Sequence, residues 1–230
     1  MSSFLEVRDL TVQYRGAPAP AVKNLSFSLD KGEILSLHGP SGSGKSTVVW
    51  ALMGMLEAYH AAASGSIRFL DSCVDLSIHK AGLRRPWSDI ALIPQSSMSV
   101  LNPIQTIGRS LTEMMDAHER GRKRAEQLDR CRALLVQVNL DPSVLHSYPH
   151  ELSGGMMQRV SIAMAMMYQP RLLIMDEATT GLDLLTEAGI LGTIRRIQRE
   201  KKMSILMISH DQFLSDAFCD RRVEIGGNHE

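Results

Sequence analysis

The sequence predicts an α/β fold with a mostly parallel sheet, an N-terminal antiparallel β subdomain and an inserted helical subdomain. Residues 4–14 and 24–29 alternate apolar and polar side chains, which is typical of half-buried strands. The short apolar runs at 33–39, 171–175 and 204–208 are instead of the kind that parallel sheets bury on both faces. Strands and helices therefore alternate along most of the chain, as they do in α/β proteins.

The first half of the chain supplies most of the predicted strands. The loop GAPAPA at 16–21 is rich in turn-forming residues and joins the first two alternating segments into an antiparallel unit. The apolar run at 33–39 ends in a glycine-rich loop, and KSTVVWALMGML at 45–56 has the length and composition of a helix. Residues 64–70 and 88–95 are predicted to be two further strands.

The region from about 99 to 169 has a helical character. Two segments, 106–120 and 121–138, have helical length, and the second carries apolar residues at the spacing of one helix face. This face consists of Ala125, Leu128, Cys131, Leu134, Leu135 and Val138. The basic run at 122–124 is interpreted as a solvated face rather than a nucleic-acid patch.

Strand and helix alternate again from residue 171 to the end of the chain. The segment 184–200 is predicted to be a crossover helix, and 221–225 the last strand. With 230 residues, 44% of them hydrophobic, the chain has enough apolar material for a core without disulfides or metals. We therefore expect a single domain over 1–230, with 1–98 and 170–230 as its α/β core and 99–169 as the helical subdomain.

Composition and charge argue against several classes of function. The formal net charge is zero, which gives no electrostatic case for nucleic acid or an anionic membrane as the main partner. The three cysteines are scattered, which is typical of reduced thiols and offers no spacing for a zinc or iron–sulfur site. No stretch approaches about 18 consecutive apolar residues, and the N-terminus lacks a signal-peptide pattern. We expect neither a membrane span nor a cleaved export signal.

Residues 39–46, GPSGSGKS, match the pattern GxxxxGK[ST] in full. The glycines let backbone N–H groups converge on phosphate oxygens, Lys45 places a positive charge at the β and γ phosphates, and the Ser46 hydroxyl can ligate Mg²⁺. Because the loop follows an apolar strand and precedes a helix, the sequence predicts a P-loop NTPase core that binds a nucleoside triphosphate. The expected nucleotide contacts are Gly39, Ser41, Gly42, Ser43, Gly44, Lys45, Ser46 and Thr47.

A second acidic element, LLIMDE at 172–177, places two carboxylates at the end of a buried strand. Ligands bind at this edge of the sheet in open α/β folds. Asp176 is suited to a Mg²⁺-associated role, mostly through water, and Glu177 to polarising an attacking water as a general base. Combined with the phosphate loop, this element predicts nucleotide hydrolysis.

The segment HELSGGMMQRV at 150–160 opens with a serine and two glycines and continues as an apolar run. This pattern is typical of a helix N-terminus whose free N–H groups hold an anion. Taken with the phosphate loop and LLIMDE, LSGG at 152–155 resembles the nucleotide-binding subunits of ABC transporters. The motifs stand in that family's order, and the resemblance covers essentially the whole chain.

The resemblance implies ATP and Mg²⁺ as cofactors and assigns roles outside the phosphate loop. Tyr14 would stack on adenine, Gln95 would link Mg²⁺ and the attacking water to the helical subdomain, and His210 would lie near the γ-phosphate. The implied catalytic residues are Glu177, His210 and Gln95, and the implied Mg²⁺ ligands are Ser46, Gln95 and Asp176. The residues that would act across a dimer interface are Ser153, Gly154, Gly155 and Asp183.

The same resemblance implies an assembly. ATP would lie between the phosphate loop of one subunit and the signature motif of another, so that two ATPase subunits, copies or paralogues, pair head to tail. Two integral membrane permease subunits and an extracellular substrate-binding protein would complete the transporter, with no nucleic acid. The chain would then lie at the cytoplasmic face of the cell membrane, attached through the permeases.

A narrower resemblance lies in SVLNPIQTIG at 99–108 and YPHELSGGM at 148–156. Both are similar to the branch that imports dipeptides, oligopeptides and nickel or metal chelates, which implies a transporter of that kind. The alternatives are the ATPase of an exporter, a soluble ABC protein that acts on ribosomes or DNA, and a guanine-nucleotide switch. The last lacks an Asn-Lys-x-Asp motif and leaves LSGG unexplained, and the soluble proteins usually carry two cassettes or a long coiled-coil insertion.

Overall fold

The computed structural model describes residues 4–77, 89–95, 101–119 and 121–226, and the chain forms two compact units. The first unit comprises the described residues of 1–92, 170–177 and 201–230, and the second those of 93–169 and 178–200. Parts of the predicted core (1–3, 78–88, 96–98 and 227–230) and of the predicted insertion (99, 100 and 120) lie outside the described residues. The subdomain limits expected from the sequence stay a prediction.

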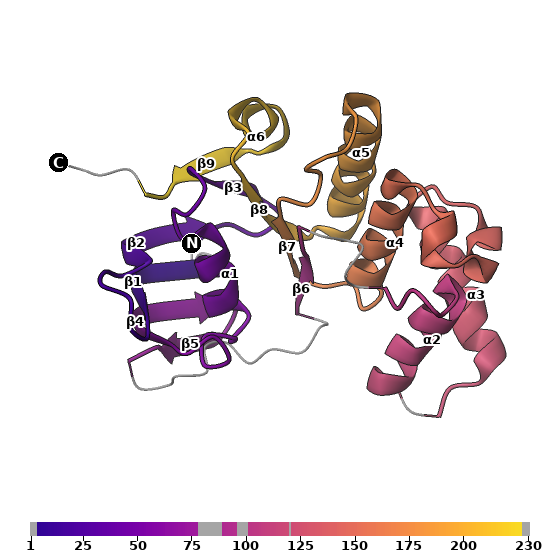
Figure 1. Cartoon of the computed structure of the whole chain (residues 1–230), viewed down its shortest axis with the longest axis horizontal. Helices are drawn as coiled ribbons and strands as arrows, with labels where there is room; N and C mark the ends of the chain where they lie inside the picture. The colour runs from indigo at the N-terminus through magenta and orange to yellow at the C-terminus, as the bar shows by residue number, and fades with distance from the viewer. Residues whose placement is uncertain (1–3, 78–88, 96–100, 120, 227–230) are drawn as a thin grey trace. The chain divides into compact units, whose positions relative to one another are not determined.

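An antiparallel sheet in the order β2-β1-β4-β5 belongs to the first unit (Figure 1). Its strands are β1 (Leu5–Tyr14), β2 (Val22–Leu29), β4 (Ala61–Phe69) and β5 (Ser72–Asp75). The central strand β1 pairs with both β2 and β4 and places Leu5 opposite Leu29 and Phe69. This confirms the predicted antiparallel subdomain. The sequence pattern does not indicate β5, because the segment SCVD contains no fully buried side chain.

A second sheet has the order β6-β7-β8-β3-β9. Its strands are β3 (Ile34–His38), β6 (Ile90–Ile93), β7 (Leu172–Asp176), β8 (Ser204–Ser209) and β9 (Arg221–Glu224). The strand β3 is parallel to both β8 and β9, and β7 is parallel to β8. The mostly parallel sheet is thus confirmed. Its topology brings the carboxyl ends of β3, β7 and β8 to one edge.

Two helices of the first unit follow strands of this sheet. Helix α1 (Lys45–Leu52) is shorter than the predicted segment 45–56, because Gly54, after the C-cap residue Met53, adopts a φ of +69°. Helix α6 (Gln212–Phe218), which the sequence pattern does not indicate, packs against β3, β8 and β9 (Figure 1). The hydrophobic core of this unit joins both sheets to α1 and includes Leu5, Leu29, Leu37, Leu52, Phe69, Ile174 and Leu206.

The second unit contains the helices of the predicted insertion. They are α2 (Ile107–His118), α3 (Arg124–Gln137), the 3₁₀ turns η2 (Pro142–His146) and η3 (Pro149–Glu151), and α4 (Gly154–Met166). All of α5 (Leu184–Lys201) except its last residue also belongs to this unit. Across the described part of the chain, no helix combines the length and the apolar character that crossing a membrane requires.

The buried face of α3 agrees with the predicted one at most positions. Cys131, Leu134, Leu135 and the following Val138 are buried. The prediction is wrong at Ala125, which is exposed. Gln127, one turn before Cys131, is buried instead, and its Nε2 donates a hydrogen bond to Asp116 Oδ1 on α2. A polar side chain with a partner lies on the buried face here, which apolar spacing alone cannot reveal.

Candidate functional site

A glycine-rich loop joins β3 to α1, and this strand–loop–helix order is the setting that the phosphate-loop motif requires. Gly42 and Gly44 have φ angles of +81° and +94°, which residues with a Cβ rarely adopt. A Cβ on Gly44 would also lie 2.3 Å from the carbonyl oxygen of Ala21. The loop therefore keeps this shape only with glycine at 44, and Ser41 and Gly42 at its tip are exposed.

Lys45 closes the loop from inside. Its ammonium donates hydrogen bonds to the carbonyl oxygens of Gly39 (2.7 Å) and Pro40 (2.8 Å), and the side chain is buried. Gly39 is packed tightly, since a Cβ there would lie 2.4 Å from the carbonyl oxygen of Ile225. Within the described residues, the buried hydroxyl of Ser43 has no hydrogen-bond partner. A buried ammonium and an unpaired hydroxyl in an exposed glycine loop fit a phosphate group.

Aromatic side chains lie beside this loop. The phenol of Tyr14, at the end of β1, is hydrogen-bonded to the hydroxyl of Thr47 on α1 at 2.9 Å. The rings of Trp50 and Tyr14 meet edge-on at 6.4 Å between centroids, and Trp50 also stacks on Tyr59 at 4.1 Å. The predicted adenine platform is therefore the first member of a cluster of three aromatic rings. Sequence reasoning misses Trp50 and Tyr59, because no motif marks them.

The carboxyl of Asp176 ends β7 and reaches the phosphate loop. Burial raises its pKa above the ordinary value, while a hydrogen bond with the Ser46 hydroxyl lowers the pKa and the Glu177 charge raises it. The Lys45 charge lowers the pKa as well, but least of the four effects. A hydroxyl and a carboxylate that already touch form the hard oxygen donor set that Mg²⁺ takes beside nucleotide phosphates. Ser46 and Asp176 thus fit a Mg²⁺ ion.

Glu177 and His210 meet at the same edge of the sheet. The carboxylate oxygen Oε1 of Glu177 lies 3.2 Å from Nδ1 of His210, although the two residues follow different strands, β7 and β8. Glu177 has a φ of +48° and donates its backbone N–H to the carbonyl oxygen of Ile208. Unusual backbone angles of this kind are concentrated at functional sites. The imidazole is 51% exposed and the carboxylate 16%, so solvent reaches the pair from the histidine side.

The other predicted site residues belong to the second unit. Ser153 is the N-cap of α4, where its hydroxyl accepts the backbone N–H of Met156 at 3.3 Å. Asp183 precedes α5 in the same way, and its carboxylate accepts the N–H of Thr186 at 3.0 Å. Hydrogen bonds from Thr186 hold the pKa of Asp183 below its usual range. Gln95 is exposed and lies two residues after the end of β6.

Within that unit the LSGG segment and the Asp183 segment lie side by side. A Cβ on Gly155 would lie 2.5 Å from Cγ2 of Thr186, and one on Gly154 would lie 3.8 Å from Leu182 Cδ2. Gly155 is thus needed where α4 approaches the start of α5. The first N–H groups of α4 lie next to these glycines and have no partners within the helix, which makes them suited to an anion.

No group of three or more His, Cys, Asp or Glu side chains that could hold a metal ion occurs among the described residues. The parallel sheet, the glycine loop with its buried lysine, and the carboxylates at the strand ends together define a P-loop nucleotide-binding protein.

Comparison with known sequences shows which family of P-loop proteins the chain belongs to. Residues 22–180 match a family model described as "ABC transporter". The dipeptide transport ATP-binding protein DppD of Haemophilus influenzae is 38% identical over 223 residues, which are 95% of this chain and 67% of DppD. The chain belongs to the ABC transporter family.

Two further relatives are longer proteins. The glutathione import ATP-binding protein GsiA of Pectobacterium atrosepticum is 42% identical over 218 residues, 90% of this chain and 35% of GsiA. The peptidoglycan transport ATP-binding protein YejF of Agrobacterium fabrum is 42% identical over 225 residues, 95% of this chain and 41% of YejF. The chain thus spans about a third of GsiA and about two fifths of YejF. These relatives confirm the resemblance to a peptide-importing branch.

Solved structures show the same fold. CbiO1 from Clostridium perfringens, part of the ABC transporter complex cbiONQ, superposes with a TM-score of 0.80 at 24% identity and covers 98% of this chain and 85% of its own. A dimeric ATP-binding cassette in a post-hydrolysis state with ADP and Pi gives a TM-score of 0.77 at 23% identity, covering 96% and 94%. The predicted fold class is confirmed.

Proposed function

We propose that this chain binds and hydrolyses ATP and powers an ABC importer of peptides or related small molecules. The contact between Glu177 and His210, beside Asp176 and the lysine-closed phosphate loop, is the observation that supports hydrolysis most strongly. A general base, a residue that senses the γ-phosphate and a phosphate cradle then lie at one edge of one sheet.

In this proposal each residue that would bind or hydrolyse ATP has a defined task. The N–H groups of the loop and Lys45 hold the β and γ phosphates, and Glu177 accepts a proton from the attacking water. His210, in contact with the Glu177 carboxylate, orients that water and the γ-phosphate. Mg²⁺ held by Ser46 and Asp176, with Gln95 contributing through water, would supply neutralisation of the phosphate charge. Tyr14 provides the stacking surface for adenine.

The second unit supplies the other half of a composite site. Ser153, the N–H groups of Gly154 and Gly155, and Asp183 would act on the ATP held by the phosphate loop of a partner ATPase, a copy or a paralogue, paired head to tail. ATP favours closure because its γ-phosphate contacts both subunits, and hydrolysis removes that contact. Gln95 would pass the resulting motion to a permease subunit.

The most detailed part of the proposal concerns the transported molecule. The relatives are named for transport of dipeptides, glutathione and peptidoglycan, which favours a peptide-like cargo over nickel or a metal chelate. Two permease subunits and an extracellular binding protein would complete the importer, with this chain at the cytoplasmic face of the membrane. Uptake of labelled dipeptides, glutathione and nickel by cells with and without the gene separates these cargos, and export or no transport would support the alternatives.

A mixing experiment tests the composite site. Lys45→Ala disables the phosphate loop of one chain, and Ser153→Arg blocks the signature motif of another. Each variant alone should show little turnover. In a mixed head-to-tail dimer one site carries both defects and the other carries none. Each mixed dimer should therefore turn over ATP at up to about half the rate of a wild-type dimer. A mixture no faster than the separate variants would contradict a site shared between copies of this chain.

A further inference from the structure

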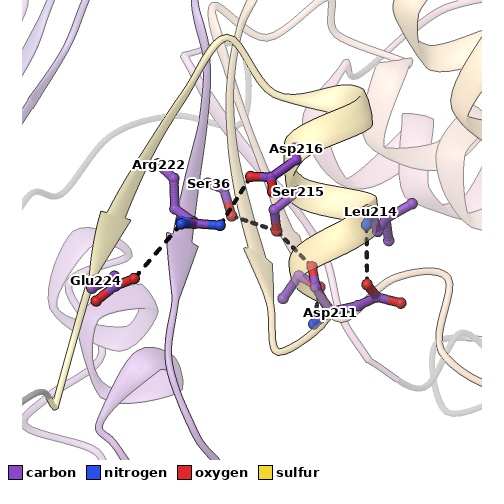
Figure 2. Close-up of polar contacts among 8 residues, drawn as sticks. Ser36, Asp211, Leu214, Ser215, Asp216, Arg222 and Glu224 are labelled. Carbon is purple, nitrogen blue, oxygen red and sulfur yellow. Dashed lines mark hydrogen bonds and ion pairs between the residues drawn. The ribbon is translucent and has the colours of Figure 1, made fainter.

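The helix that follows His210 is fixed by a set of polar contacts that the proposed function does not use (Figure 2). Asp211 is the N-cap of α6, and its carboxylate accepts the backbone N–H of Leu214 at 3.0 Å. His210 directly precedes this cap, so the placement of the first turn of α6 sets where the imidazole lies. Whatever holds that turn acts on the distance between His210 and Glu177.

Two buried serines make hydrogen bonds that fix the first turn of α6. The hydroxyl of Ser36 on β3 donates to the Ser215 hydroxyl at 2.9 Å, and Ser215 donates to the Asp211 carbonyl oxygen at 2.8 Å (Figure 2). The two serines are 0% and 2% exposed. Since a buried hydroxyl is unfavourable without a partner, a chain in which each hydroxyl donates once is a stable arrangement that also fixes a direction.

The backbone on the carboxyl side of His210 is held from β8 as well. The N–H of Asp211 donates to the Ser209 hydroxyl at 2.9 Å, and Ser209 lies beside His38 in the pairing of β8 with β3. Both the N–H and the carbonyl oxygen of Asp211, directly after the histidine, therefore have partners. By contrast, the imidazole itself is half exposed, and Glu177 is its hydrogen-bonded partner at the strand ends.

The buried chain also connects two parts of the proposed site. Ser36 lies on β3, the strand that leads into the phosphate loop at Gly39. Ser215 lies on α6, the helix that starts after His210. We propose that Ser36 and Ser215 are positioning residues for His210, which keep the first turn of α6 at a fixed place relative to the phosphate-loop strand. This inference rests on the proposed ATP hydrolysis.

An outer contact on α6 is a weaker tether. Arg222 on β9 reaches Asp216 at 2.9 Å and Glu224 at 3.8 Å (Figure 2). The carboxylates of Asp216 and Glu224 are 59% and 69% exposed, and ion pairs with such solvent access contribute little. The buried hydroxyl chain, rather than this surface pair, is accordingly the contact that fixes the helix.

The experiment combines serine and histidine variants in a kinetic cycle. Ser36→Ala and Ser215→Ala, singly and together, should lower kcat for ATP about five-fold, a size compatible with one hydrogen bond's net contribution, and leave the KM for ATP within about two-fold. The double variant replaces both hydroxyls and should melt close to the wild type, because the Asp211 carbonyl oxygen still accepts the backbone N–H of Ser215 at 3.2 Å. Ser215→Thr, which keeps the hydroxyl, should restore most of kcat.

The cycle also separates positioning from simple folding. In a His210→Ala background, Ser215→Ala should change the single-turnover rate less than about two-fold, because its effect runs through the missing imidazole. The matched control is Thr112→Val, which removes a buried hydroxyl that donates to its own helix at Gly108, 2.7 Å away, on α2. This variant should leave kcat unchanged.

The outcomes distinguish this inference from the proposed function. An equal serine effect with and without His210, or kcat at the wild-type level in the double alanine variant, overturns the positioning role. A wild type that does not hydrolyse ATP, or one that His210→Ala does not slow, overturns the proposed function, and the positioning role fails with it.

Discussion

At the scale of single residues, the site depends on a few positions where only one residue type fits. Gly44 combines a left-handed backbone with a backbone oxygen 2.3 Å from where a Cβ would lie, so it is fixed by sterics rather than by chemistry. Asp176 is fixed by chemistry, since its carboxyl is desolvated beside Ser46 and Lys45. Both features suit the phosphate and Mg²⁺ chemistry of the proposed function.

Replacing Gly44 by alanine should disable the loop. The left-handed angle alone costs roughly 1–2 kcal/mol for a residue with a Cβ. The contact with the Ala21 carbonyl adds to this cost and forces the loop to move. The matched control is Gly32→Ala, which has a φ of +78° but no atom within 4 Å of a new Cβ. Thermal melting and ATP titration should show a larger loss for Gly44→Ala and loss of ATP binding only there. Equal losses would contradict the steric explanation.

Asp176→Asn should stabilise the nucleotide-free protein and remove its response to Mg²⁺-ATP. The folded chain holds a proton on this carboxyl more tightly than the unfolded chain, because burial raises the pKa. Stability from this group is therefore present at low pH and is lost as the pH rises through the raised pKa, so ionised Asp176 is destabilising at neutral pH. Removing the charge should raise the Tm, by roughly 2–4 °C for each kcal/mol gained.

The ligand response is the second readout for Asp176. Saturating Mg²⁺-ATP raises the Tm of a protein that binds it only when folded, and this rise should be much smaller for Asp176→Asn. Asp216→Asn removes an exposed carboxylate and serves as the control, with both values near the wild type. An Asp176→Asn variant that melts below the wild type would contradict the pKa direction.

Residue patterns in the sequence predict the site unevenly. Lys45, Asp176, Glu177 and His210 follow apolar strands in recognisable motifs, and strand pairing in the structure places them at one sheet edge. The Ser36–Ser215 pair has no such signal, because the two residues are far apart in sequence and serine is common. Contacts of this kind depend on tertiary packing and become visible only in three dimensions.

At the scale of elements, length and alternation decide what a sequence reveals. Strands such as β1 and β8 have clear apolar patterns, whereas β5 and α6 have only four and seven residues, too few to show a period. Helix α3 is an intermediate case, since four apolar positions are buried as predicted, whereas Ala125 is exposed and the polar Gln127 is buried. The amide of Gln127 donates a hydrogen bond to Asp116 on α2, so α2 and α3 are held together by a polar contact as well as by apolar packing.

The packing of α3 can be checked through its cysteine. Burial raises the pKa of the Cys131 thiol to about 11. Because the thiolate is the reactive form, Cys131 should not react with a disulfide reagent at pH 8 in the folded protein, whereas exposed Cys73 should react. A Cys73→Ser, Cys219→Ser variant isolates Cys131. This variant should stay unlabelled until urea unfolds it, and rapid labelling of the folded chain would show that the α3 face is open.

At the scale of the whole molecule, the two units carry different halves of the proposed chemistry. The phosphate loop, Asp176, Glu177 and His210 belong to the first unit, and Gln95, the LSGG segment and Asp183 to the second. The order of motifs along the sequence predicts the fold class, which the family match and the solved structures confirm. The partner and the cargo do not follow from this chain, because the groups that would select them belong to other proteins.

The most direct test of ATP hydrolysis by this fold is the turnover of Glu177→Gln. Glutamine has nearly the same shape as glutamate and can still contact His210, but it cannot act as a base. ATP binding should stay at the wild-type level, turnover should fall at least about 100-fold, as loss of a general base does, and an ATP-bound closed dimer should accumulate. Turnover at the wild-type rate in Glu177→Gln, with ATP bound equally well, would show that Glu177 is not the base.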